Sequence, residues 1–418
     1  MGEWSPNRTL TIILAIVVIA LTLALVVYPE QGFNAGVHGM KIFWDVVFPS
    51  LLPFFILSEV MLGLGVVHAL GVLLEPLMRP LFSVPGVGAF ALSMGLAAGY
   101  PMDAVITAKF RKSGMCSRVE GERLLAFTNT ADPLFMFGAV AVGMFHKPAV
   151  GVLIALAHYL ASFLVGVSFK FYGLREERLG PRQIEPAKGK LFRRAFQELM
   201  RARQEDGRTL GQLLGDAVND SIRTLLMICG FIIFFSVLLE VMKLAQLTAI
   251  VALPIRGLLA LLGIAPSLVG PALSGLFEID IGTAQVAAAK APLIDQLVMA
   301  SAIIAWSGFS VHAQVASVVT GTDIRIGPYF AARGLHAGLA ALFTAVFWQM
   351  GIGRTAAAES NPVFPAFLHT SGSARDTLRS SLESIALWVL LIAAAMALSL
   401  LIDLLRRIRV VLWTARTK

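Results

Sequence analysis

Residues 91–135 decide the fold of this chain, with ALSMGLAAGYPMDAVITAKF at 91–110 and LLAFTNTADPLF at 124–135. Both pieces are apolar enough to lie inside a membrane, yet helix-breaking residues interrupt each of them. Gly99-Tyr100-Pro101 interrupts the first piece, and the run from Thr128 to Pro133 interrupts the second. Proline lacks a backbone N–H and disfavours helix in the residue before it, so each piece is expected to form two half-helices. Because irregular backbone at membrane depth must be covered by protein or reached by water, the two breaks predict a binding site.

The composition of the 418-residue chain indicates a membrane protein with several spans. It is 57% hydrophobic and only 14% charged, with a mean hydropathy of +0.78, whereas soluble domains carry about 25% charged residues. The net charge is +8, but the basic residues lie in short segments beside apolar runs. That placement follows the positive-inside rule and argues against a nucleic-acid partner.

The same sequence offers no motif for catalysis or for nucleotide binding, so we expect a protein that is not an enzyme and that does not use ATP. Cys116 and Cys229 are the two cysteines, and they indicate neither a disulfide framework nor a metal site. We therefore expect no cofactor, although a proton or a cation could couple to the function.

The apolar segments predict an all-α polytopic membrane protein with about eight transmembrane helices and two re-entrant hairpins in two inverted repeats. Residues 29–41 carry little charge and are expected to form an outer loop. Basic segments place the loop 173–215 and both termini in the cytoplasm. The predicted parts are an N-terminal membrane helix and outer loop at 1–40, a first repeat at 41–172 with a hairpin at 85–110, a basic cytoplasmic loop at 173–215, a second repeat at 216–350 with a hairpin at 266–290, an outer loop at 351–383, and a C-terminal membrane helix and basic tail at 384–418.

Within the basic loop, apolar residues recur at helical spacing between Leu191 and Met200, beside several arginines. This pattern predicts an amphipathic helix that lies on the anionic inner leaflet of the membrane. A helix that docks a partner protein is the alternative.

The two halves of the chain show a weak internal repeat. Leu92-Ser93 leading to Asp103 corresponds to Leu273-Ser274 leading to Asp280, and a broken helix follows each segment. The positive-inside rule gives the two halves opposite orientations in the membrane. Inverted repeats whose broken helices meet near the midplane are the architecture of secondary transporters.

We expect four breaks, at residues 99–101, 128–130, 279–282 and 307–310. They would bring the ends of several half-helices together, and helix N-termini favour carboxylate or phosphate groups. For individual glycines, close helix packing is the alternative. His312 is either a ligand or a hydrogen-bonded packing residue. The predicted substrate-binding residues are Gly99, Tyr100, Pro101, Thr128, Asn129, Thr130, Ser307, Gly308, Ser310, His312 and Gln314.

Acidic residues at membrane depth are expensive and therefore indicate function. Asp103, Asp132, Glu278 and Asp280 are expected to bind a coupling cation, to carry a proton, or to cap a half-helix. A cap suits Asp103, which follows Pro101 at the start of a half-helix. Glu278 and Asp280 favour coupling, because two carboxylates so close together compete for charge. We expect no arginine at this depth.

Five segments together resemble the YlbJ-type (SpoVV) sporulation integral membrane proteins. The chain is also similar, more diffusely, to the wider group with nucleoside-recognition gate domains, which includes concentrative nucleoside transporters. The resemblance covers roughly residues 40–350 and rests on FPSLLPFFILSE (48–59), GYPMDA (99–104), FTNTADPLF (127–135), SGLFEIDIG (274–282) and GFSVHAQV (308–315).

The resemblance implies delivery of dipicolinic acid, a pyridine dicarboxylate, from the mother cell toward the forespore across the outer forespore membrane. The expected partners are therefore a small organic anion and the lipid membrane, and a homo-oligomer is compatible with the sequence. Two rival functions stay open at this point. One is a transporter of nucleosides or cations on the same fold, and the other is a scaffold that organises sporulation membranes without transport.

Overall fold

The computed structural model describes residues 8–174 and 191–352, and every regular element within those ranges is a helix. Four segments are long and apolar enough to cross a membrane, and the number rises to six if each of two bent helix pairs counts as one span. The expected outer loop at 351–383 and the last membrane helix at 384–404 fall almost entirely outside the described residues. The total of eight spans therefore stays a prediction.

Residues 29–41 are not a loop, which corrects the sequence-based expectation. They form helix α2 (Pro29–Ile42), which follows α1 (Arg8–Val27) after a bend of 104°. Proline is well suited to the first turn of a helix, and small residues let two helices approach closely. Gly39 lies against Ser236 of α11 (Leu210–Leu244), so closely that an added Cβ would come within 2.5 Å of the serine hydroxyl.

The chain then runs through η1 (Phe43–Val47), which is a π-helical turn, into α3 (Phe48–Gly63) and α4 (Val66–Leu77). Gly65 has a φ of 81° at the bend between α3 and α4. A Cβ at this position would lie 2.4 Å from the carbonyl oxygen of Leu199 in α10 (Leu191–Asp206). Glycine is therefore required here both by the backbone conformation and by the close approach of α10.

A helix break lies at or beside each of the four predicted places. The third break falls at Glu278, whereas the predicted residues 279–282 form the first turn of a helix. The helix pairs are α5 (Gly88–Ala98) with α6 (Met102–Lys112), α7 (Arg118–Thr128) with η3 (Phe135–Met144), α13 (Val269–Phe277) with α14 (Ile279–Ala288), and α15 (Leu293–Trp306) with α16 (Gly308–Val319). Two unbroken helices, α8 (Val150–Phe169) and α17 (Ile326–Gln349), pack against each other beside them.

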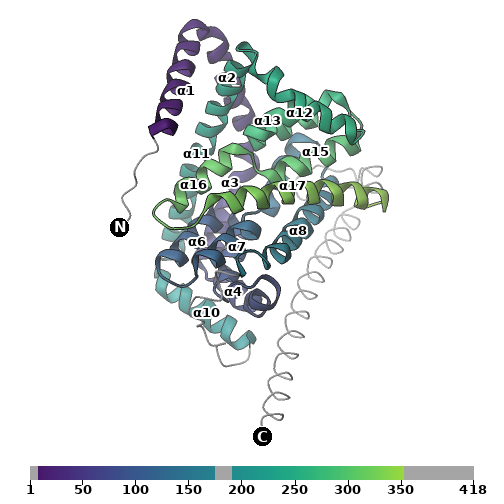
Figure 1. Cartoon of the computed structure of the whole chain (residues 1–418). Coiled ribbons are helices and arrows are strands. Elements are labelled where there is room, and N and C mark those ends of the chain that lie inside the picture. Colours follow the sequence, from purple (N-terminus) through teal and green to yellow (C-terminus); the bar gives the residue numbers. More distant parts are fainter. Residues whose placement is uncertain (1–7, 175–190, 353–418) are drawn as a thin grey trace, which may run out of the picture.

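Contacts in the two halves correspond to each other. Helix α4 packs on α5 as α12 (Leu247–Leu261) packs on α13, and α6 contacts α16 as α14 contacts η3. Helices α7 and α15 each contact both α8 and α17. Figure 1 shows α4 and α12 at opposite ends of the molecule. This pattern is what two inverted repeats would produce, and the repeat itself remains our prediction.

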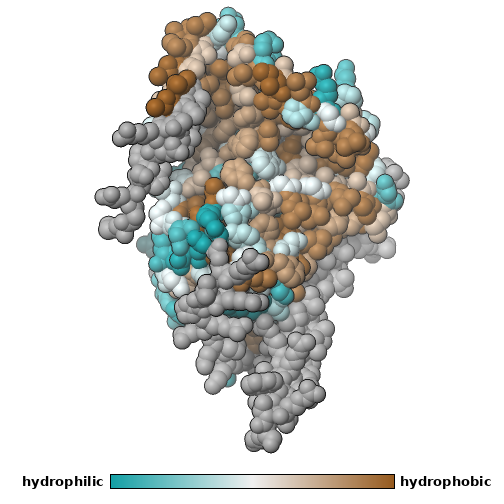
Figure 2. Space-filling model, in the orientation of Figure 1, coloured by the Kyte–Doolittle hydropathy of each residue, from teal (hydrophilic) through white to brown (hydrophobic). Residues whose placement is uncertain are grey.

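The amphipathic segment of the basic loop is helical, as α10. It packs on α4, where Arg194 Nη2 lies 2.5 Å from Glu75 Oε2. Phe192 and Phe196 remain exposed, with 56% and 65% of their surface accessible. Figure 2 shows hydrophilic residues gathered near α6, toward the end of the molecule where α10 lies, and a broad apolar surface elsewhere on this face.

Candidate functional site

Two adjoining cavities lie between the two halves, where the broken helices meet. The inner cavity has a volume of about 60 Å³, and the outer cavity of about 300 Å³. Phe55, Tyr100, Phe231 and Gln314 line both of them. Residues from α3, the first break, α11 and α16 therefore lie where the small chamber adjoins the larger one.

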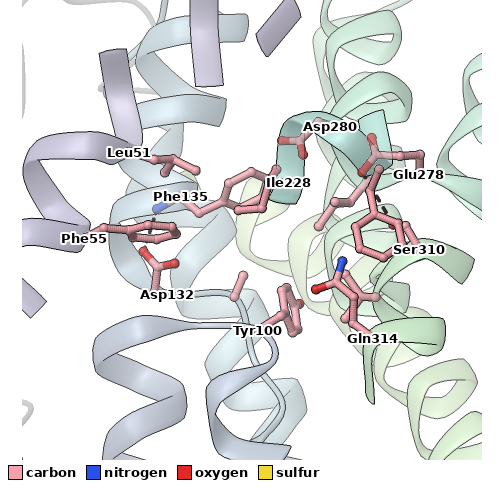
Figure 3. Close-up of a pocket in the computed structure, with 14 residues that line it drawn as sticks. Leu51, Phe55, Tyr100, Asp132, Phe135, Ile228, Glu278, Asp280, Ser310 and Gln314 are labelled. Atoms are coloured by element: carbon pink, nitrogen blue, oxygen red, sulfur yellow. Dashed lines mark hydrogen bonds between the residues drawn. The ribbon is translucent and has the colours of Figure 1, made fainter. Parts of the chain in front are cut away.

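Side chains from all four broken helices reach the inner cavity (Figure 3). Tyr100 comes from the first break and Asp132 from the second. Glu278 and Asp280 come from the third, and α16 after the fourth break contributes Ser310 and Gln314. The breaks are far apart in sequence, so their convergence supports the interpretation of these segments as parts of one site.

The outer cavity has a different lining. Pro101 and Met102 bring the N-terminus of α6 to it, and hydroxyl groups come from Ser221, Thr224 and Ser317. Glu59 is the one acidic residue among the described residues that line it, and no lysine or arginine is among them. This chamber can offer hydroxyls, an amide, aromatic faces and a helix N-terminus to a ligand.

Seven predicted residues line one or both cavities, and eight lie outside them. The lining residues are Tyr100, Pro101, Asp132, Glu278, Asp280, Ser310 and Gln314. The residues outside the cavities are Gly99, Asp103, Thr128, Asn129, Thr130, Ser307, Gly308 and His312.

A buried hydrogen-bond network holds most of the polar residues outside the cavities. Asn129 Nδ2 donates to Asp103 Oδ1 at 2.8 Å, and Thr128 Oγ1 donates to Asp103 Oδ2 at 3.2 Å. Tyr329 of α17 donates its hydroxyl to Asn129 Oδ1 at 2.8 Å. We expected Asp103 to cap α6, but the side-chain hydrogen bonds that it accepts come from the second break. It therefore ties the first two broken helices together.

Arg333 of α17 lies at this depth, so the expectation that no arginine would do so is wrong. Its side chain is fully buried and donates to the backbone carbonyl oxygens of Asn129 and, at 2.6 Å, Ala126. These carbonyls belong to the C-terminal end of α7, which carries partial negative charge. A single arginine in the apolar segment 326–349 was the signal in the sequence.

Two of the four acids do act as helix caps. Asp132 Oδ1 accepts from the backbone N–H groups of Leu134 at 2.9 Å and Phe135 at 2.8 Å. Glu278 Oε2 accepts from the N–H of Ile281 at 2.8 Å, at the start of α14. In contrast, Asp280 Oδ1 is buried without a hydrogen-bond partner in the structure.

His312 packs among aromatic rings, and its Nε2 atom is buried without a hydrogen-bond partner in the structure. Its Nδ1 lies 2.7 Å from the carbonyl oxygen of Gly308, and its ring centroid lies 4.4 Å from that of Trp306 and 4.5 Å from that of Phe330. Gly308 has a φ of 71°, and a Cβ there would lie 3.0 Å from the carbonyl of Phe277. Among the residues that the structure describes, no group of three His, Cys, Asp or Glu side chains is placed to hold a metal ion.

Ion pairs join the two halves at the basic end of the molecule. Arg111 of α6 contacts both carboxylate oxygens of Asp323 at 2.6 and 2.8 Å, and Glu122 of α7 accepts from Arg325 at 2.8 Å. The hydrogen bond from Arg111 lowers the pKa of Asp323 below its ordinary value of 3.8. Asp323 and Arg325 lie in the loop between α16 and α17.

Comparisons with known proteins give a family match and one close relative. The Gate family, described as nucleoside recognition, matches residues 44–165. The chain is 45% identical over 340 residues to the sporulation integral membrane protein YlbJ of Bacillus subtilis (strain 168), which covers 81% of this chain and 83% of that protein.

Solved structures of two CNTnw variants are also similar to this chain. One, in an intermediate state, has a TM-score of 0.45 at 11% identity and covers 82% of this chain and 86% of its own. The other, in an outward-facing state, has a TM-score of 0.41 at 12% identity. The match covers 80% of this chain and 90% of that structure's chain.

Proposed function

The chain belongs to the YlbJ family of sporulation integral membrane proteins, and from this premise we propose that it is a secondary transporter of a small organic anion. The observation that carries the proposal is the meeting of four broken helices at two adjoining cavities. A rigid membrane scaffold has no need for irregular backbone at this depth, whereas a carrier uses it to bind and release its substrate.

The outer cavity is the proposed substrate site. Its volume is about 300 Å³, against about 60 Å³ for the inner cavity. Phe55, Tyr100 and Phe231 can pack on a flat ring. The hydroxyl groups of Ser221 and Ser317 can donate to carboxylate oxygens, whereas that of Thr224 already donates to the carbonyl oxygen of Asp220. The N-terminus of α6 adds partial positive charge.

Dipicolinic acid is the substrate that we propose, on the ground of family membership. It is an aromatic dicarboxylate, and the outer cavity combines aromatic faces with hydroxyl donors. We propose alternating access by the two inverted repeats without ATP, in the outer forespore membrane. The basic end with α6 and α10 would then face the cytoplasm.

Reconstitution into liposomes tests the proposal. We expect the protein to carry labelled dipicolinate, and we expect Gln314→Ala to slow uptake about tenfold, which corresponds to about 1.4 kcal/mol of lost interaction. Gln204→Ala on the exposed side of α10 is the matched control and should leave uptake unchanged. Equal uptake by the Gln314→Ala variant, or no uptake by the wild-type protein, would contradict the proposal.

A nucleoside transporter is the second candidate, because the matching Gate family is described as nucleoside recognition. Uridine in the same liposomes separates the two candidates. Competition of uridine against dipicolinate, with faster uptake of uridine, would favour the nucleoside. A scaffold would carry neither compound and would keep its role in spore formation in the Gln314→Ala variant.

A further inference from the structure

We propose that Asp280 binds the proton that couples to substrate movement, and that the inner cavity is the proton chamber beside the substrate chamber. The coupling part of this inference rests on the proposed transport function. The protonation of Asp280 does not depend on the transport function, because it is argued from the surroundings of this carboxylate alone.

Among the carboxylates of the inner cavity, Asp280 is the one with an oxygen that is buried and has no hydrogen-bond partner in the structure. Its surface is 4% exposed, and its Oδ1 atom accepts no hydrogen bond in the structure. Figure 3 shows it at the start of α14, with Asp132 on the other side of the cavity. A buried charge without a partner is strongly disfavoured, and such a carboxylate is neutralised by binding a proton or a cation.

The neighbouring acids are satisfied in a way that Asp280 is not. Asp132 Oδ1 accepts two backbone N–H bonds. Glu278 Oε2 accepts one backbone N–H, and its Oε1 lies 3.5 Å from Ser310 Oγ. Donors that stabilise a negative charge therefore face Asp132 and Glu278. Asp280 is therefore the acid of the inner cavity whose ionised form is least stabilised by hydrogen bonds.

No basic side chain among the described residues lines the inner cavity to neutralise Asp280. The titratable groups that face it are Tyr100, Asp132 and Glu278, with Glu59 in the adjoining chamber. On the helices packed against α14, the other charged side chains are exposed or have partners, and the Cys229 thiol belongs to the apolar core. The exposed ones are Glu30, His38, Lys41, Asp216, Asp220 and Arg223, and those with partners are Glu240, Lys243 and Asp295.

A proton suits the chamber better than a metal ion. Within the described part of the chain, no three acidic, histidine or cysteine side chains are placed to coordinate a metal. The volume of about 60 Å³ is enough for a few water molecules, and the outer cavity next to it offers them a path. Water can therefore deliver a proton to Oδ1, where an O–H bond forms and the carboxylate becomes neutral.

Protonation would also change the position that Asp280 and the α13–α14 segment can take in the inner cavity. Neutral Asp280 can lie against Leu51 and Ile228, which line the same cavity, whereas ionised Asp280 requires water. Charge on this residue therefore favours a hydrated, open inner cavity, and a bound proton favours a closed one. Substrate in the outer cavity would respond to the same movement.

Infrared spectroscopy tests protonation without any transport. Wild-type protein should show the carbonyl stretch of a buried neutral carboxylic acid, and Asp280→Asn should lose it. Asp45→Asn, which removes an exposed carboxylate from η1, is the matched control and should keep the band. A band that persists in the Asp280→Asn variant would overturn the assignment.

Transport then tests coupling. In liposomes we expect a pH gradient to change net dipicolinate uptake by the wild-type protein, whereas the amide of Asp280→Asn cannot take up or release the proton. Net uptake by the variant should no longer respond to a pH gradient. A preserved pH response in the variant, or a response of the wild-type protein to sodium in place of protons, would overturn the coupling. If the wild-type protein carries no dipicolinate, the transport proposal fails while the infrared result still decides protonation.

Discussion

At the scale of single residues, Arg333 holds the end of α7 and the second break in place within the buried network. It is fully buried, and it supplies charge-assisted hydrogen bonds to the carbonyl end of α7. Tyr329, one helical turn earlier, holds Asn129 from the same helix. Helix α17 thereby fixes the position of the second break, which also carries Asp132 into the inner cavity.

Replacing Arg333 should destabilise the fold more than it alters the cavities. We expect Arg333→Leu to lower the free energy of unfolding by about 2–4 kcal/mol, because two buried carbonyls lose their donors. The measurement is thermal unfolding in detergent, with Arg193→Leu on the exposed side of α10 as the control. An unchanged melting temperature for the Arg333 variant would contradict the structural role that we assign to it.

The Arg111–Asp323 pair should stabilise the protein in a pH-dependent way. The pKa of Asp323 is lowered by its hydrogen bond from Arg111, so the contribution is present above the ordinary value of 3.8 and is lost as the pH falls through the lowered value. Asp323 is half exposed, which limits the contribution to below about 1 kcal/mol. Asp323→Asn should therefore reduce the melting temperature slightly at pH 7, and the difference from wild type should disappear in strong acid. A difference that persists there would show that the ion pair is not its cause.

Sequence reasoning reached some of these residues and not others. It identified the acids and Gln314 because polar residues at membrane depth are conspicuous. It missed Arg333, and it could not foresee the contacts of Arg111 with Asp323, which lie 212 positions apart. The aromatic neighbours of His312 come from other helices, so no local pattern contains these contacts.

At the scale of elements, glycine and proline located the first, second and fourth breaks because their effects on the backbone are local. The third break lies at Glu278, beside the predicted residues 279–282, which belong to α14. Helix α2 was missed because its packing partner, α11, lies far along the chain. The π-helical segments η1, η2 (Met78–Phe82) and η3 were also not predicted, since tertiary packing decides whether a turn widens.

Helix α10 should lie at the membrane surface with its phenylalanines in the lipid. Phe192 and Phe196 are exposed on one side, while Arg194 pairs with Glu75 of α4 on the other. A fluorescent label at position 196 should be quenched by lipids that carry a quencher near their headgroups, and a label at position 204 should be quenched much less. Equal quenching at both positions would favour the alternative of a helix that docks a partner protein.

At the scale of the whole molecule, the corresponding contacts of the two halves and the shared cavities are the basis of the alternating-access mechanism that we propose. The inner cavity receives acids from both halves, and the outer cavity receives the N-terminus of α6 from one half and α16 from the other. Movement of one half against the other would therefore open the chambers alternately to the two sides of the membrane.

Access to position 314 from each side of the membrane tests this claim most directly. Gln314 lines both cavities, and the natural cysteines Cys116 and Cys229 are buried and can be replaced. We predict that a Gln314→Cys variant in oriented liposomes reacts with a membrane-impermeant thiol reagent from either side, and that dipicolinate slows both reactions. Reaction from one side only, unaffected by dipicolinate, would contradict alternating access at a shared site.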